Sequence, residues 1–277
     1  MPPVERTLAL RHAMALGLLQ GPVELLPISS SGHIALLPWL AGWSYAELDG
    51  ELRKSVEVAL HAGAGLALAI DMRGDLWREA SRIDRRRASM LALSLVPPVS
   101  AGFALRGRIE RLLGGPRSIA MGLVMGSIAM ALADTRSARG HEQVRAAEDA
   151  GAADGLALGL AQASALIPGV SRNGATLAAA RGRGFDREAA HTLSWSVAPP
   201  VILGASALKG ARLLSDGIPR QARVGLLLGA ASAFLSTLAS LAVLRERRPG
   251  ALLPYSLYRC LLASLVIVRL RRERVRS

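Results

Sequence analysis

Apolar residues along the chain fall into long blocks that are separated by short, arginine-bearing connectors. Six blocks run for roughly 18 to 23 residues, the length of an α-helix that crosses the hydrocarbon core of a membrane. The pattern therefore predicts spanning helices at 55–72, 88–105, 117–134, 188–208, 222–244 and 251–269. Pro97-Pro98 and Pro199-Pro200 fall inside two of these blocks, where they are expected to kink or break the helix.

Two further apolar blocks, residues 13–43 and 155–180, have polar centres that read LLQGPVELLPISSSGH and LAQASALIPGVSRNGAT. Proline-, glycine- and serine-rich backbone at membrane depth cannot face lipid, because its N–H and C=O groups would lack partners. Such backbone is tolerated where it is buried in protein or lines a wet cavity. We therefore predict two re-entrant helical hairpins beside the six spans, and an all-α polytopic membrane protein.

The two polar-centred blocks are related to each other in sequence. A shift of 142 positions aligns Gln20 with Gln162, Ile28 with Val170, Ser29 with Ser171 and Gly32 with Gly174. If three spans follow each hairpin, the two halves insert with opposite topology, because three is odd. The pattern predicts a single membrane domain built as an inverted repeat, with halves 1–135 and 154–277 joined by a polar connector at 136–153. Such repeats bind ligands where broken helices meet.

The 277-residue chain is 51% hydrophobic and has a net charge of +13. Its arginines lie in short connectors and not on one face with interleaved aromatic residues, which argues against nucleic acid and favours anionic lipid headgroups as partners. Both sets of alternating connectors are rich in arginine, so the charge pattern leaves the membrane orientation open. Cys260, the single cysteine, has no companion for a disulfide or a metal site. A homo-oligomer is also left open.

Glu24, His33 and Arg172 are ionisable residues in otherwise apolar blocks. A charge at the bilayer centre costs about 2.5 to 3.5 kcal/mol on insertion scales, so such residues usually mark a functional site. An ion pair between Glu24 and Arg172 that holds the hairpins together is the structural alternative. Such a pair would also be compatible with a catalytic role.

The second hairpin contains the residue types of a phosphate-binding loop. Glycines let the backbone approach a ligand, hydroxyls and amides donate hydrogen bonds, and arginine binds phosphate oxygens as a bidentate fork. A helix that begins near Asn173 would direct N–H groups at the same anion. The candidate phosphate ligands are Gly169, Ser171, Arg172, Asn173, Gly174 and Thr176.

The first hairpin places Ser29, Ser30, Ser31 and His33 shortly after Glu24. Hydroxyl, imidazole and carboxylate are the parts of an activated nucleophile or of a water-activating site. Alternatively, the carboxylate holds a divalent cation that neutralises charge during phosphoryl transfer. Together the hairpins indicate a phosphate-bearing lipid as ligand, and no P-loop, dinucleotide-binding, HExxH or CxxC motif points elsewhere.

These motifs resemble those of a known family. QGPVELLPISSSGH resembles the first signature of the bacitracin-resistance-type undecaprenyl-diphosphatases, and IPGVSRNGAT resembles the second, PG-x-SR-(small polar)-G-x-T. The similarity continues through SVEVALHAGAGLALAI, FDREAAHTLSWSVAPPVILGA and YSLYR, and so spans essentially the whole chain. It implies an all-helical inverted repeat with two re-entrant regions.

The resemblance also implies an activity and a place in the cell. The family dephosphorylates undecaprenyl diphosphate, a polyprenyl diphosphate lipid, to the monophosphate, which recycles the lipid carrier of cell-wall synthesis and confers bacitracin resistance. A divalent cation, Mg²⁺ or Ca²⁺, assists. The enzyme lies in the bacterial cytoplasmic (inner) membrane, and its site opens towards the outer side. A polyprenyl-phosphate transporter or flippase without hydrolytic activity is the alternative, since inverted repeats with broken helices are also transporter architecture.

Residue roles follow from the same resemblance. Gln20 and Glu24 match the acidic pair, His33 the signature histidine, Ser29 to Ser31 the hydroxyl run, and Ser171, Arg172 and Thr176 the diphosphate-binding loop. The expected catalytic residues are Glu24, Ser30, His33 and Arg172, with Glu24 also the expected metal ligand. Gln20, Ser29 and Ser31 are expected to bind the substrate together with the phosphate ligands of the second hairpin. Spacing does not distinguish Ser30 from its two neighbours as nucleophile, and direct attack by water is the alternative mechanism.

Three positions depart from the pattern of the family. Gln20 replaces the first glutamate of many members, which removes one metal ligand. Asn173 stands where serine is usual, and His61 stands where glutamine is common. None of these departures breaks a signature, so they bear on efficiency and metal dependence more than on the reaction.

Overall fold

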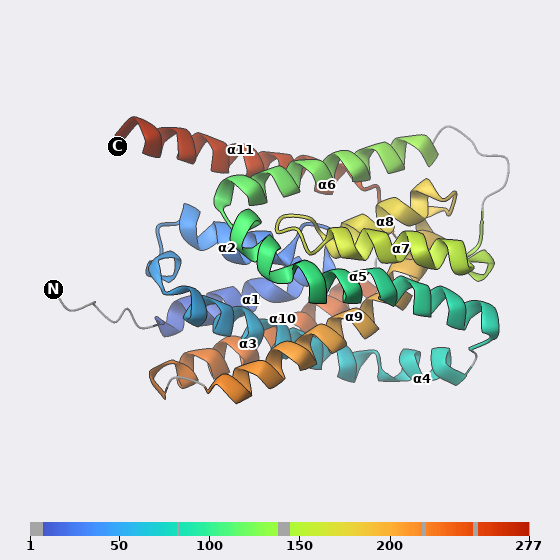
Figure 1. Cartoon of the computed structure of the whole chain (residues 1–277), viewed down its shortest axis with the longest axis horizontal. Helices are drawn as coiled ribbons and strands as arrows, with labels where there is room; N and C mark the ends of the chain where they lie inside the picture. Colours follow the sequence, from blue (N-terminus) through green and yellow to red (C-terminus); the bar gives the residue numbers. More distant parts are fainter. Residues whose placement is uncertain (1–7, 82, 138–144, 218–219, 246–248, 277) are drawn as a thin grey trace. The chain divides into compact units, whose positions relative to one another are not determined.

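The computed structural model describes residues 8–81, 83–137, 145–217, 220–245 and 249–276. This part of the chain forms α-helices joined by turns and short 3-10 segments, and it contains no β-strand (Figure 1). The helices are α1 (Leu10–Leu25), α2 (Ser30–Leu40), α3 (Gly50–Asp71), α4 (Arg73–Ser81), α5 (Arg85–Leu113), α6 (Pro116–Ser137), α7 (Ala152–Ser164), α8 (Arg172–Gly182), α9 (Arg187–Asp216), α10 (Arg223–Arg245) and α11 (Leu253–Arg276). The prediction of an all-α fold is confirmed.

Four described helical segments are long and apolar enough to cross a membrane, and they match four predicted spans. They are Arg85–Leu105, Pro116–Thr135, Arg220–Leu244 and Leu253–Val275. The pair α3 and α4 also has the required length and composition when taken together, but it bends by 60° where the two helices meet, as in a broken span or a re-entrant loop. The protein is therefore a multi-pass membrane protein.

The sixth predicted span, 188–208, lies within α9. This segment is helical, but serine, glycine and proline dilute its apolar residues, and it is not among the spans that length and composition support in the described residues. Pro97-Pro98 and Pro199-Pro200 break neither α5 nor α9. Of the predicted connector 136–153, residues 138–144 lie outside the described residues.

The two polar-centred blocks form pairs of short helices, which fits the predicted hairpins. α1 and α2 have 16 and 11 residues, and α7 and α8 have 13 and 11, so each is shorter than a spanning helix. The turns between them contain Pro27 and Pro168-Gly169.

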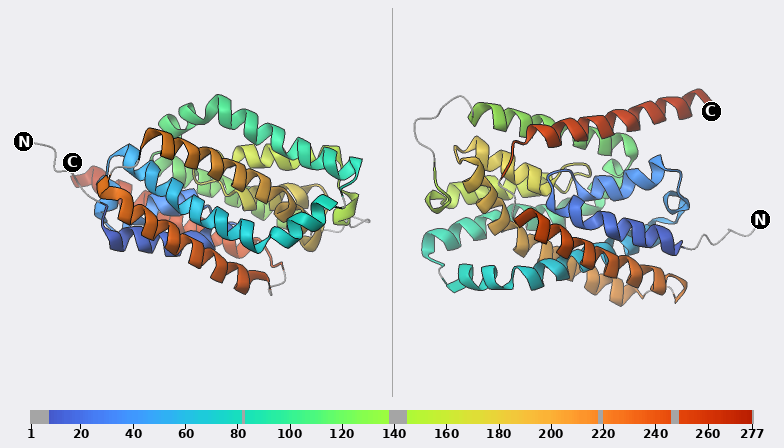
Figure 2. Two further views of the ribbon diagram at one scale, coloured as in Figure 1. Left: turned by 90° about the horizontal axis from the view of Figure 1, so that it is seen from below. Right: turned by 180° about the vertical axis from the view of Figure 1, so that it is seen from behind.

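The chain divides into two compact units, each of which contains segments from both predicted halves. Unit 1 holds the described residues within 1–25, 33–74 and 202–246, and unit 2 those within 26–32, 75–201 and 247–277. In unit 1, α10 packs against α1 and α3. In unit 2, α5 packs against α7, and α6 packs against α8 and α11 (Figure 2).

Packing within the two units follows a reciprocal pattern. When α3 and α4 are counted as one helix of the first half, α5 and α10 are each the fourth helix of their half. In unit 1, α1 is covered by α10. In unit 2, α7 is covered by α5, the fourth helix of the first half. A Cβ at Gly17 would lie 2.4 Å from the carbonyl oxygen of Gly229, and one at Gly159 would lie 2.7 Å from that of Leu93. The same 142-residue shift relates these two glycines. The inverted symmetry of the halves stays a prediction.

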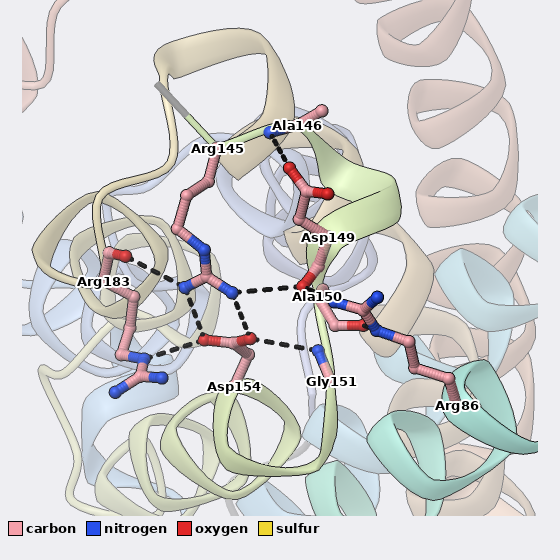
Figure 3. Close-up of polar contacts among 8 residues, drawn as sticks. All are labelled: Arg86, Arg145, Ala146, Asp149, Ala150, Gly151, Asp154 and Arg183. Carbon is pink, nitrogen blue, oxygen red and sulfur yellow. Dashed lines mark hydrogen bonds and ion pairs between the residues drawn. The ribbon is translucent and has the colours of Figure 1, made fainter. Parts of the chain in front are cut away.

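A buried carboxylate holds the start of α7 in unit 2 (Figure 3). The side chain of Asp154 is 4% exposed. Its oxygens accept hydrogen bonds from Arg145 (2.7 and 3.0 Å), from Arg183 Nε (2.8 Å) and from the N–H of Gly151 (3.0 Å). Burial by itself would raise the pKa of Asp154, but these donors outweigh it and hold the pKa well below its usual range. The second hairpin is thus tied to the loops on either side of it.

Candidate active site

Unit 2 contains the two loops that carry the family signatures, and each loop ends in a serine that caps the helix that follows. The hydroxyl of Ser29 accepts the N–H of Gly32 at 3.3 Å, at the start of α2. The hydroxyl of Ser171 accepts the N–H of Gly174 at 3.2 Å, at the start of α8. Serine is favoured at this position because its oxygen satisfies one of the N–H groups that lack a partner within the helix. The residues that the 142-residue shift aligns therefore make the same local structure.

The three serines of the first loop differ in their surroundings. Ser29 is 2% exposed, and its backbone has a φ of 78°, which is uncommon for a residue other than glycine. Its hydroxyl serves as the helix cap, whereas Ser30 and Ser31 are only partly buried at the first positions of the helix. Left-handed backbone at a non-glycine residue costs about 1 to 3 kcal/mol and is found mainly at functional sites.

The tips of the two loops touch each other within unit 2. A Cβ built on Gly32 would lie 3.6 Å from the Cα of Gly169. Gly169 has a φ of 94°, and a Cβ there would lie 2.2 Å from the carbonyl oxygen of Ile119 on α6. Only glycine permits this backbone conformation and this close approach at once. The predicted Ser29–Ser31 run and the predicted phosphate loop are thus brought together.

Two predicted phosphate ligands have side chains that bond to α9. The hydroxyl of Ser194 donates to Asn173 Oδ1 at 3.0 Å and lies 2.5 Å from the hydroxyl of Thr176. Thr176 is fully buried, and its hydroxyl is also 3.0 Å from the carbonyl oxygens of Arg172 and Asn173. In this geometry Asn173 and Thr176 fix the first turn of α8 against α9. Arg172 is the first residue of α8 and is only partly buried.

Unit 2 therefore presents the groups that suit an anion. Helix N-termini leave N–H groups and a partial positive charge for a bound phosphate, and the starts of α2 and α8 carry hydroxyls and a guanidinium besides. Arg172 can bind two phosphate oxygens at once, because its guanidinium has fixed, parallel donors.

Unit 1 contains a second group of polar residues, at the end of α1. Gln20 Nε2 donates to Glu24 Oε2 at 3.1 Å, and His61 Nε2 lies 3.8 Å from the same oxygen. His61 Nδ1 lies 2.8 Å from the carbonyl oxygen of Glu57. A carbonyl can only accept, so Nδ1 carries a hydrogen and Nε2 of the neutral ring is an electron-pair donor that faces Glu24. His33 also belongs to unit 1 and is fully buried, one residue after Gly32.

The residues around Glu24 fit a hard divalent cation in part. No group of three histidine, cysteine, aspartate or glutamate residues suited to a metal occurs among the described residues. However, Gln20 Oε1 is buried and has no hydrogen-bond partner in the described part of the chain, so an amide oxygen lies beside a carboxylate and an imidazole nitrogen. Mg²⁺ is commonly held by one or two carboxylates together with substrate phosphates and water. Glu24 and Gln20 are therefore the residues that would hold it.

Two polar residues near these groups were not predicted as site residues. In the sequence, only a departure from the family pattern marks His61, and its proximity to Glu24 arises from the packing of α3 within unit 1. Arg259 lies in the predicted span 251–269 and is fully buried. The sequence signal for Arg259 was available, because a lone arginine inside an apolar block is as unusual as Arg172.

These features define an all-α multi-pass membrane protein in which two serine-capped helix starts lie against each other. The chain belongs to the bacitracin resistance protein BacA family, whose profile matches residues 13–265. It is 36% identical to the undecaprenyl-diphosphatase of Geobacter sulfurreducens over 272 residues, which cover 94% of this chain and 97% of that one. It is 33% identical to that of Pelotomaculum thermopropionicum over 95% of this chain and 97% of that one, and 35% identical to that of Pelobacter propionicus over 93% and 96%.

Proposed function

We propose that the protein is an undecaprenyl-diphosphatase that hydrolyses undecaprenyl diphosphate to undecaprenyl phosphate and inorganic phosphate. This reaction recycles the lipid carrier of cell-wall synthesis and underlies bacitracin resistance. The observation that carries the proposal is the contact between two serine-capped helix starts in unit 2, in a membrane protein of the BacA family. Two helix N-termini side by side suit a ligand with two phosphate groups.

The residues have distinct roles in the proposed reaction. Ser30 Oγ attacks the terminal phosphorus while His33 accepts its proton. The bond from that phosphorus to the bridging oxygen breaks, undecaprenyl phosphate leaves, and water then releases phosphate from the serine. Ser30 is preferred over Ser29 because the hydroxyl of Ser29 caps α2 and is buried. Arg172 binds the oxygens of the transferring phosphoryl group and stabilises their charge.

A divalent cation, Mg²⁺ or Ca²⁺, belongs to the proposal as well. Glu24 and Gln20 would hold it, and when bound it would neutralise part of the negative charge of the diphosphate. Without such a cation, Glu24 would instead form an ion pair with His61 when that ring is protonated, since Nε2 lies 3.8 Å from its carboxylate. The proposed location is the bacterial cytoplasmic membrane with the site open to the outer side, and a homo-oligomer stays a prediction.

Phosphate release from undecaprenyl diphosphate by the purified protein in detergent tests the activity. The wild-type protein should release one phosphate per lipid, and Glu24→Gln and Arg172→Ala should release little. A protein that binds the lipid and moves it across vesicle membranes without releasing phosphate would be a flippase, and the proposal would be wrong.

Acid-quenched turnover of substrate labelled in its terminal phosphate tests the nucleophile. A phosphoserine intermediate should retain label in the wild-type protein, and Ser30→Ala should retain none. Because the serine and its base act as one unit, Ser30→Ala and His33→Ala should be non-additive. If no label stays with the protein and Ser30→Ala remains active, water attacks directly and His33 is the base for that water.

A further inference from the structure

Arg259 of α11 is a buried cation with no assigned role. It is fully buried, and the hydrogen bonds described for it involve no carboxylate. Its Nε is buried without a hydrogen-bond partner in the described part of the chain. An arginine removed from water without a counter-ion is strongly unfavourable unless other groups satisfy its donors. Its retention in a spanning helix therefore needs a structural reason.

Both terminal nitrogens of Arg259 bind the carbonyl oxygens of the two signature loops. Nη1 donates to Pro27 at 3.2 Å, and Nη2 donates to Gly169 at 3.0 Å and to Gly122 on α6 at 3.4 Å. Pro27 and Gly169 are aligned by the 142-residue shift, and each lies two residues before its capping serine. The guanidinium thus makes equivalent contacts with the two halves, which its symmetric pair of terminal nitrogens permits.

The space around the guanidinium is provided by glycines. A Cβ at Gly126 would lie 2.3 Å from Nη2, and one at Gly174 would lie 3.3 Å from Nη1. α6 and α8 therefore leave room for a planar group between the loops, and a larger residue at Gly126 would displace it. Burial, hydrogen bonding and the close approach of two glycines fix the guanidinium of Arg259 at one place.

We propose that Arg259 is a positioning residue that sets the separation of the two serine-capped helix starts for a diphosphate ligand. Its two hydrogen bonds hold both loop backbones just before Ser29 and Ser171, and its charge adds to the positive ends of α2 and α8. Lysine keeps the charge, but it cannot bind two carbonyls in one plane. This inference rests on the proposed function, because it assumes that the bound anion is the diphosphate of the substrate.

The experiment compares Arg259→Lys and Gly126→Ala with the wild-type protein and with Arg271→Lys, the same chemical change at an exposed position of α11. Each is purified in detergent, and we measure its melting temperature, its kcat and KM for phosphate release, and the rise in melting temperature that inorganic pyrophosphate produces. A misplaced binding group costs up to about 100-fold, so both test variants should lose roughly 10- to 100-fold in kcat/KM. Inorganic pyrophosphate should no longer raise their melting temperature, although both variants should be folded in its absence. Arg271→Lys should behave as wild type.

The outcomes separate this inference from the proposed function. If Arg259→Lys is folded and its kcat/KM stays within about twofold of wild type, Arg259 does not position the loops. If Arg259→Lys fails to fold, Gly126→Ala decides, because it keeps the arginine and moves it. Loss of activity that follows loss of folded protein in both variants would make Arg259 a stability residue and overturn the inference. If the wild-type protein does not release phosphate, the proposed function is wrong. In that case the rise in melting temperature that inorganic pyrophosphate produces would be the test of Arg259.

Discussion

Replacing Asp154 with asparagine tests how the second hairpin is held. The carboxylate accepts a bidentate pair from Arg145, one hydrogen bond from Arg183 and one from the N–H of Gly151 (Figure 3). Asparagine keeps the shape of the side chain, but it loses the charge and turns an NH₂ group towards these donors. Two arginines then lie beside each other without the carboxylate that both of them contact.

The magnitude follows from burial. Removing one partner of a fully buried ion pair costs about 3 to 5 kcal/mol. Here the aspartate is buried, but the side chains of Arg145 and Arg183 are 30% and 43% exposed and can turn towards water. We therefore expect a loss of about 2 to 3 kcal/mol in the free energy of unfolding. At roughly 2 to 4 °C per kcal/mol, the melting temperature should fall by about 5 to 10 °C.

The loss should depend on pH in a defined direction. The pKa of Asp154 is below its usual value in the folded protein, so its stabilising effect is complete above the unfolded pKa of about 4 and is lost as the pH falls through the lower, folded value. Asparagine does not titrate. The difference in melting temperature between wild type and variant should be constant above about pH 5 and should shrink on acidification below about pH 4.

Thermal melts in detergent across this pH range provide the assay, with Glu148→Gln as the control. Glu148 is exposed and close in sequence, and its replacement removes one charge without removing a buried acceptor. A melting temperature of Asp154→Asn that equals that of Glu148→Gln would show that the ion-pair cluster does not stabilise the hairpin. If the difference in melting temperature between the wild-type protein and Asp154→Asn did not shrink below about pH 4, the stabilisation would not depend on the charge of the aspartate.

Three further substitutions, one of them with a matched control, have expected outcomes. Arg172→Lys should lower phosphate release by about 30- to 1000-fold, because a lost bidentate contact in the transition state costs roughly 2 to 4 kcal/mol; near-normal release would refute the role. Gly169→Ala should destabilise the protein by about 2 to 4 kcal/mol in thermal melts, since its Cβ would meet Ile119 at a positive φ. Gly182→Ala, where the Cβ meets nothing, should not destabilise it. Gln20→Glu should strengthen the dependence of activity on free Mg²⁺ or Ca²⁺, and identical titration curves would mean that the residue at position 20 does not hold the cation.

Features set by local pattern were predictable from the sequence. Apolar block length gave four spans, and the proline- and glycine-rich centres gave the two pairs of short helices. The serine caps also follow from local preference, since serine is favoured where a helix starts. The bend between α3 and α4 does not follow from the pattern, because the charged segment after Asp71 is typical of a connector, whereas in the structure it is helical.

Features set by contacts between distant segments were not predictable. Pro27 and Arg259 are far apart in sequence, and nothing near either residue indicates the hydrogen bond between them. The same holds for His61 and Glu24, which meet only because α3 packs beside α1. The positive φ of Ser29 is also hidden, because glycine is the residue that usually signals this conformation.

The two loops share a backbone but differ in the chemistry they present. With the 142-residue shift that aligns the caps Ser29 and Ser171, Ser30 falls on Arg172. The same first helical position is therefore a hydroxyl in one half and a guanidinium in the other. A hydroxyl can be a nucleophile and a guanidinium can stabilise negative charge, whereas two identical loops would supply only one of these functions. In the proposed reaction, the capped turns would therefore bind phosphate in the same way, and the residue after each cap would divide attack and charge stabilisation between the two loops.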